Sequence, residues 1–140
     1  MNFLRKYVLY LAFAQALVAT LGSLIFSEIL HFPPCVLCWY QRIALYPLVV
    51  IFGVAILKKD KLVHFYAWPL IAFGWVIAFY HNLLYYNILP ESAAPCIAGV
   101  SCTTKFIEWF GFITIPFLSL TSFTTLGVLM VIYQRVKRDK

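Results

Sequence analysis

The chain has 140 residues, of which 64% are apolar and only 11% are charged, whereas an ordinary soluble domain carries about 25% charged residues. This composition excludes a soluble globular protein and predicts an integral membrane protein. The formal net charge of +6 does not indicate a nucleic-acid partner, because nine of the eleven basic residues flank apolar segments and therefore set membrane topology.

Four apolar stretches are long enough, or nearly so, to cross a hydrocarbon core of about 30 Å, which takes about 20 helical residues. In chain order they cover residues of about 7–26, 39–57, 65–86 and 110–133. Each must be helical, because lipid cannot satisfy open backbone groups. The first is too long for a secretory signal and lacks a small-residue cleavage site. We expect an all-α, up-down-up-down bundle of four transmembrane helices, in a single integral membrane domain over residues 1–140.

The basic residues predict which side of the membrane each loop occupies. The nine that flank the helices are Arg5, Lys6, Lys58, Lys59, Lys61, Arg135, Lys137, Arg138 and Lys140. By the positive-inside rule their side is cytoplasmic, so both termini are cytoplasmic and the loops of about 27–38 and 87–109 are outside. The chain's four cysteines, Cys35, Cys38, Cys96 and Cys102, then lie in or at the edge of the outer loops. That is the side on which disulfides persist.

Two further features concern the predicted spans. Pro47, Pro69 and Pro116 lie inside the second, third and fourth stretches, where proline removes a backbone hydrogen bond and is expected to kink the helix. No carboxylate lies within any of the four stretches. This argues against a small proton-coupled exporter, whose chemistry needs an acid inside the membrane.

Cys35 and Cys38 form a Cys-X-X-Cys motif, a spacing that allows two sulfurs on one helical turn to exchange between dithiol and disulfide. Zinc sites use the same spacing. Pro33 and Pro34 precede the motif, and because proline is favoured in a first helical turn, the second helix is expected to begin at or just before Cys35. There the helix dipole would favour the reactive thiolate.

Arg42 and His81 are the candidate partners of this motif. Arg42 follows Cys38 by four residues, which puts it on the same helical face as both cysteines and slightly deeper. The alternative is a side chain that snorkels to the surface. His81 lies at a comparable depth on the third helix and could be a packed core residue, or could flank, with Arg42, the head of a lipid-soluble acceptor. His31 and His64 look like ordinary interfacial residues.

Cys96 and Cys102 are separated by five residues in a loop-like segment. A bridge closing so short a loop contributes about 2–2.5 kcal/mol in the chain-entropy model, and four helices do not need it. A working, reversible disulfide is therefore expected rather than a structural one. Two pairs on one side suggest that electrons pass from pair to pair, and the remaining alternative is a zinc site made of all four cysteines.

These motifs carry a family resemblance. "CVLCWYQR" at the start of the second of four helices, a second outer cysteine pair, and "FYHNLLY" near the end of the third helix resemble the disulfide bond formation protein B (DsbB) family. The short second loop resembles its Gram-positive, BdbC-type branch. The resemblance implies a multi-pass thiol-disulfide oxidoreductase of the bacterial cell membrane. It would pass electrons from a thioredoxin-fold thiol oxidase outside, of DsbA or BdbD type, to a membrane quinone, a relay known to keep the bacterial periplasm oxidising.

The resemblance also implies roles by position. Cys35 and Cys38 resemble the quinone-coupled pair, Arg42 the residue that supports the quinone, and Cys96 and Cys102 the pair that meets the partner, with His81 a second candidate quinone neighbour. Menaquinone is expected rather than ubiquinone. In Gram-negative members the second pair is far apart in sequence, so which of these two sulfurs is attacked first stays open here.

Two other classes of protein share parts of the pattern. A quinone reductase like vitamin K epoxide reductase has four helices and a Cys-X-X-Cys motif, but its motif is expected late in the bundle. A non-catalytic four-helix membrane protein with two structural disulfides would require all four sulfurs to be inert.

Overall fold

The computed structural model describes residues 3–94, 101–103 and 113–138. Its four long helices are α1 (Phe3–Leu24), α2 (Val36–Lys58), α3 (Val63–Tyr85) and α4 (Ile115–Arg138). A π-helical turn, η1 (Ile25–Ile29), continues α1, and a short 3-10 turn, η2 (Glu91–Ala93), follows α3. All four long helices are long and apolar enough to span a membrane. The predicted all-α fold with four spans is confirmed.

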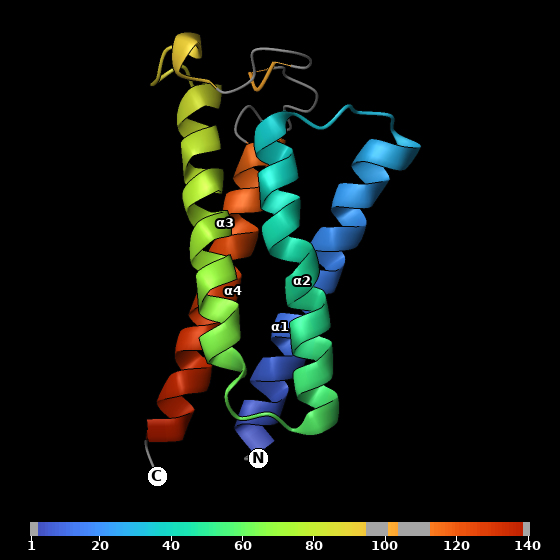
Figure 1. Ribbon diagram of the computed structural model, residues 1–140, viewed down its shortest axis with the longest axis vertical. Helices are drawn as coiled ribbons and strands as arrows, with labels where there is room; N and C mark the ends of the chain where they lie inside the picture. The colour runs from blue at the N-terminus through green and yellow to red at the C-terminus, as the bar shows by residue number, and fades with distance from the viewer. Residues whose placement is uncertain (1–2, 95–100, 104–112, 139–140) are drawn as a thin grey trace.

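The helices pack lengthwise into one bundle, in which α1 contacts α2 and α4, and α3 also contacts α2 and α4 (Figure 1). The main core lies between them and contains, among others, Leu9, Leu48, Phe52, Ile71 and Leu126. Large apolar side chains also cover the outside, as Leu57 does at 83% exposure, which suits a surface in contact with lipid. A smaller apolar cluster surrounds Cys35 and Cys102, where α2 begins and α3 ends, and we call this end of the bundle the cysteine end.

The first helix is longer than predicted at both ends. It begins at Phe3, so Arg5 and Lys6 lie within α1 rather than before it. With η1 its span reaches Ile29 and includes Glu28 in the last turn, which corrects the expectation that no span contains a carboxylate. Glu28 is exposed at the helix end. Hydropathy marks only the apolar part of a helix, because polar side chains in its terminal turns can reach the interface.

Arg5 is buried at the opposite end of the bundle. Its Nη2 donates to the backbone oxygen of Lys61 at 3.3 Å, and its guanidinium lies 4.3 Å from the centre of the Tyr133 ring. The Tyr133 hydroxyl donates to the backbone oxygen of Asp60 at 3.1 Å. These contacts join α1 and α4 to the α2–α3 turn. His64, expected to be interfacial, is also buried here, beside the rings of Phe65 and Tyr133.

The three prolines predicted to lie inside helices occupy two kinds of position. Pro47 and Pro69 lie inside α2 and α3 as expected. Pro116 is the second residue of α4, because this helix begins at Ile115 and not near residue 110. In the first turn a proline displaces no helical hydrogen bond, so the expected kink in α4 is wrong. The predicted start of this helix, and Cys96, lie outside the described residues.

Gly74 provides a test of how closely α3 and α4 pack. A Cβ atom at this position would overlap the ring of Phe123, which is itself buried, so the ring would have to shift. We expect Gly74→Ala to lower the stability of the bundle by about 1–3 kcal/mol, the usual cost of overpacking, measured by thermal unfolding in detergent. Gly127→Ala is the matched control, because its added Cβ would make an ordinary 3.8 Å contact with Ile71. Equal losses in both variants would contradict the expectation.

Candidate active site

The first cysteine pair lies at the start of α2. Cys35 is the N-cap residue with extended backbone angles, and its Sγ accepts a hydrogen bond from the backbone N–H of Cys38 at 3.4 Å. The helix therefore begins one residue after Cys35, and Pro33 and Pro34 lie in the non-helical lead-in rather than in the first turn. The two Sγ atoms are 2.9 Å apart and unbonded, so the pair is in its dithiol form.

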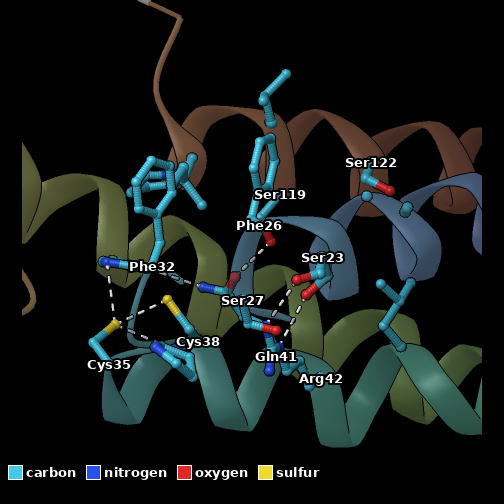
Figure 2. A pocket seen from close by; sticks show the side chains of 18 of the residues that line it. Ser23, Phe26, Ser27, Phe32, Cys35, Cys38, Gln41, Arg42, Ser119 and Ser122 are labelled. Atoms are coloured by element: carbon cyan, nitrogen blue, oxygen red, sulfur yellow. Dashed lines mark hydrogen bonds between the residues drawn. The ribbon is translucent and has the colours of Figure 1, made fainter. Parts of the chain in front are cut away.

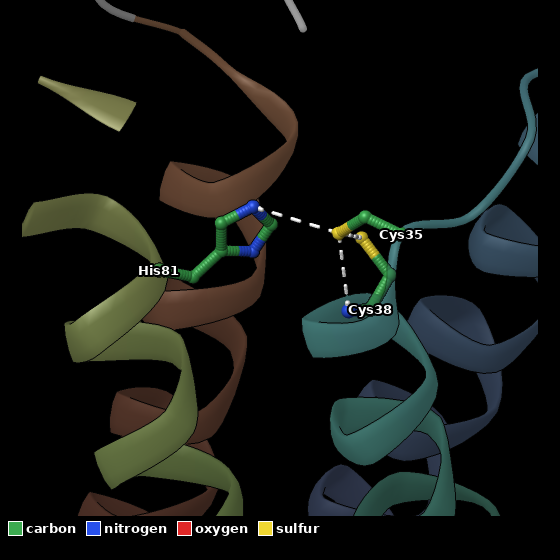
Figure 3. A group of neighbouring side chains, drawn as sticks. All are labelled: Cys35, Cys38 and His81. Atoms are coloured by element: carbon green, nitrogen blue, oxygen red, sulfur yellow. Dashed lines mark hydrogen bonds between the residues drawn. The ribbon is translucent and has the colours of Figure 1, made fainter. Parts of the chain in front are cut away.

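His81 of α3 faces this pair (Figure 3). Its Nε2 lies 3.8 Å from Cys35 Sγ and 3.2 Å from the backbone oxygen of Cys102, and only 3% of the residue is exposed. One imidazole thus contacts the first pair and the segment that carries the second. The sequence indicated His81 as a neighbour of an electron acceptor, but not this link between the cysteines.

Gln41 orients the imidazole, and sequence reasoning missed it. Its Nε2 lies 3.2 Å from His81 Nδ1, and its Oε1 accepts a 2.6 Å hydrogen bond from the Ser119 hydroxyl of α4. With Nδ1 accepting from Gln41, the neutral imidazole carries its proton on Nε2, directed at Cys35 and Cys102. The available signal was a polar amide one turn after Cys38, beside Arg42, in a mostly apolar stretch.

Arg42 is buried rather than snorkelling, with 8% of its surface exposed. Its Nε donates to the Ser23 hydroxyl and its Nη2 to the Ser23 backbone oxygen, each at 2.9 Å, and its guanidinium lies 5.5 Å from the Trp39 ring centre. Within the described part of the chain, these two bonds use two of the five N–H donors of a guanidinium. The others are available to a ligand.

These groups lie around a cavity of about 370 Å³ between the helices (Figure 2). Cys35, Cys38, Arg42, His81 and Cys102 all contribute to its lining. Much of the remaining wall is apolar, and includes Val18, Ala19, Phe26, Leu45 and Phe123. The volume lies in the usual range for small-molecule pockets, and an apolar wall with few polar groups suits a lipid-soluble ring.

Cys102 is buried and disulfide-bonded. The second member of the predicted pair, Cys96, lies outside the described residues. A disulfide sulfur is not a thiolate ligand, so in this form the protein does not contain the zinc site of four cysteines considered from the sequence.

Cys35 lies just before the membrane-spanning part of α2, and its surroundings favour the thiolate. The hydrogen bond from the Cys38 thiol lowers the pKa most, and hydrogen bonding and charge from His81 lower it further, whereas burial raises it. Together they hold the Cys35 pKa at about 4, against about 8.5 for a free cysteine.

This low pKa predicts an unusual pH profile for alkylation of the reduced protein. The thiolate is the reactive form, so the rate at Cys35 should stay flat from pH 8 to about 5 and fall with a midpoint at about 4. Iodoacetamide labelling followed by peptide mass spectrometry measures the rate. Cys38→Ala should raise the midpoint more than His81→Ala does, because the Cys38 hydrogen bond is the larger cause. A parent midpoint near 8.5 would contradict this assignment.

Comparison with known proteins is consistent with this arrangement. The family model for disulfide bond formation protein DsbB matches residues 5–133. Disulfide bond formation protein C of Bacillus subtilis is 44% identical, with 96% of this chain and 98% of that one aligned. Probable disulfide formation protein C 1 of Bacillus anthracis is 47% identical over 89% of each chain. A probable disulfide formation protein of Metapseudomonas resinovorans is 39% identical over 91% and 90%. No solved structure matches significantly.

Proposed function

Because the chain belongs to the DsbB family and is therefore a multi-pass membrane disulfide oxidoreductase, we propose that it re-oxidises an extracytoplasmic thioredoxin-fold thiol oxidase and passes the electrons to a membrane quinone. The Gram-positive type of the resemblance favours menaquinone over ubiquinone. The positive-inside rule favours the outer face for the cysteine end. Family membership goes against the alternatives of a vitamin K epoxide reductase-like enzyme and an inert four-helix protein.

The proposal rests on the groups that lie together around one cavity. A free dithiol and a buried cation line the same apolar cavity, and His81 joins that dithiol to the segment of the second pair. The dithiol can supply two electrons, the cavity can hold a lipid-soluble acceptor, and the imidazole gives the two pairs a common neighbour. A second cavity among the described residues, beside Trp68 and Arg135, has no cysteine in its lining.

The first step is exchange with the partner at the second pair. A thiolate of the reduced partner attacks the Cys96–Cys102 disulfide and forms a mixed disulfide, which the partner's second thiol resolves. The partner leaves oxidised, and Cys96 and Cys102 are left as thiols. Two electrons and two protons have then entered the protein.

The second step is exchange between the pairs, and Cys35 is the sulfur suited to it. Its Sγ is the one within 3.8 Å of His81 Nε2, which is also 3.2 Å from the Cys102 carbonyl. A thiolate of the second pair attacks Cys35 of the Cys35–Cys38 disulfide, and Cys38 leaves as a thiolate. The other thiol of the second pair then attacks the mixed disulfide, so that the second pair closes again and Cys35 leaves as a thiolate. The Nε2 proton of His81 would stabilise negative charge developing on the Cys35 sulfur.

The third step returns the first pair to its disulfide, with Cys38 facing the acceptor. Cys38 lies deeper in the helix than Cys35 and closer to Arg42 along the same face. When bound in this cavity, a quinone would supply the sink for the two electrons and two protons of the dithiol. The free donors of Arg42 would stabilise negative charge on a ring oxygen in this low-dielectric cavity, and Ser23 would keep the guanidinium in place.

Reconstitution tests the proposal directly. The full chain is placed in vesicles with menaquinone and given a reduced thioredoxin-fold dithiol oxidase, and one quinol should form for each partner disulfide. The double variant Cys96→Ser/Cys102→Ser should not react with the partner, yet should still reduce quinone when a small dithiol reduces Cys35–Cys38 directly. The proposal fails if the parent reduces no quinone, or if this double variant accepts electrons from the partner as fast as the parent does.

A further inference from the structure

When the first pair is a dithiol, its two cysteines and His81 bring three metal-ligating atoms close together (Figure 3). Cys35 Sγ, Cys38 Sγ and His81 Nε2 all lie within 4.8 Å of one another. Thiolate sulfur and imidazole nitrogen are the ligands that zinc prefers. We propose that the reduced protein binds a soft divalent cation, for which Zn²⁺ is the probe, through Cys35, Cys38 and His81, and that the oxidised protein does not.

The geometry requires only small side-chain movements. Ideal tetrahedral bonds of about 2.3 Å to sulfur and 2.0–2.1 Å to nitrogen place two sulfurs about 3.8 Å apart and a sulfur about 3.5 Å from the nitrogen. The present separations are 2.9 Å between the sulfurs and 3.8 Å between Cys35 Sγ and His81 Nε2. The sulfurs would separate by about 0.9 Å, which side-chain rotation at the start of α2 can provide.

The second shell is suited to a metal-bound histidine. Such a histidine usually donates its other ring N–H to an oxygen, and Gln41 lies at that position beside His81 Nδ1. Rotating the Gln41 amide by half a turn presents Oε1 to an Nδ1–H group. Its Nε2 then faces the Ser119 hydroxyl, which can accept as well as donate. With the ring proton on Nδ1, His81 Nε2 carries no proton and can bind the metal.

Redox state controls the proposed site, because only the dithiol supplies thiolates. Zinc binds cysteine as the thiolate, so the reduced pair would coordinate as a zinc dithiolate and release whatever protons its sulfurs still carry. A disulfide has no such sulfurs to offer. The cavity beside the cluster leaves room for water as a fourth ligand. If the proposed function holds, Zn²⁺ would block quinone reduction by trapping the reduced pair.

The binding experiment needs neither quinone nor partner, so its outcome is separate from that of the proposed function. The background is Cys96→Ser/Cys102→Ser, which keeps the first pair and removes the second. This protein, reduced in detergent and freed of reductant, is titrated with Zn²⁺ against a chromophoric chelator. We expect one ion per chain for the reduced protein and none after oxidation to the Cys35–Cys38 disulfide.

Variants assign the ligands. Gln41→Leu should weaken Zn²⁺ binding by roughly 10–100-fold, the usual effect of losing a second-shell partner, and His81→Ala should weaken it more. His31→Ala, at an exposed position that is not part of the cavity lining, should leave the affinity unchanged. X-ray absorption of the zinc-loaded background protein should show two sulfurs and one nitrogen near their standard distances, a measurement that does not depend on any variant folding. Unchanged affinity in His81→Ala, or zinc bound equally by the oxidised protein, would overturn the proposal.

Discussion

Cys38→Ser should lower the rate of quinone reduction by more than about a thousandfold, to the uncatalysed background. Removing a covalent participant from a group that acts as a unit typically abolishes catalysis on this scale. Serine cannot form a disulfide, so Cys35 alone can neither give up two electrons nor be resolved within its own pair. Quinol formation in vesicles, followed spectrophotometrically, measures the loss.

The same variant also distinguishes the roles of Cys35 and Cys38. Without Cys38, the Cys35 thiolate remains beside His81 and should attack the second pair, forming an interpair disulfide that is visible by alkylation and peptide mapping. Cys35→Ser should lose turnover equally but form no such species, because we assign the exchange to Cys35. An interpair disulfide that instead accumulates through Cys38 in Cys35→Ser would reverse our assignment of the two roles. Thermal unfolding of both variants serves as the control for folding.

Arg42→Met should lower kcat/KM for quinone by about 10²–10³-fold, comparable to the loss of one donor that stabilises developing negative charge. Methionine fills a similar volume but removes both the charge and the donors facing the cavity. Arg42→Lys should recover only part of the activity, because an ammonium group lacks the planar fork that meets the Ser23 hydroxyl and carbonyl together. Steady-state kinetics with varied quinone and saturating reduced partner provide the measurement.

Ser23→Ala is the matched control for Arg42. It removes one of the two bonds that hold the guanidinium but leaves the charge, so its loss should lie between those of the parent and Arg42→Met. The rate of exchange between the partner and the second pair, measured in a single turnover without quinone, should be the same in all of these proteins. Equal kcat/KM for quinone in Arg42→Met and the parent would remove Arg42 from the site.

Local sequence was sufficient to predict the four helices and the face of α2 that carries the motif. Hydropathy located four spans to within a few residues, and the four-residue interval from Cys38 to Arg42 predicted that both project from the same side of α2, where both line one cavity. The boundaries were less predictable. Arg5 lies inside α1, because this helix extends into a first turn whose polar residues carry no hydropathy signal. Pro116 lies at the start of α4, which begins only at Ile115, because hydropathy does not distinguish an apolar residue before a helix from one within it.

Contacts between helices depended on the tertiary structure. His81 reaches Cys35 across 46 positions in the chain, Gln41 reaches Ser119 across 78, and Arg42 is bonded to Ser23 of α1. The sequence by itself determined the spans, the motif and the side of α2 that carries it, because side-chain direction within a helix follows from its regular rotation per residue. Which groups meet that side was decided only by the tertiary structure, because the rotation and depth of each helix are set by how the whole bundle packs.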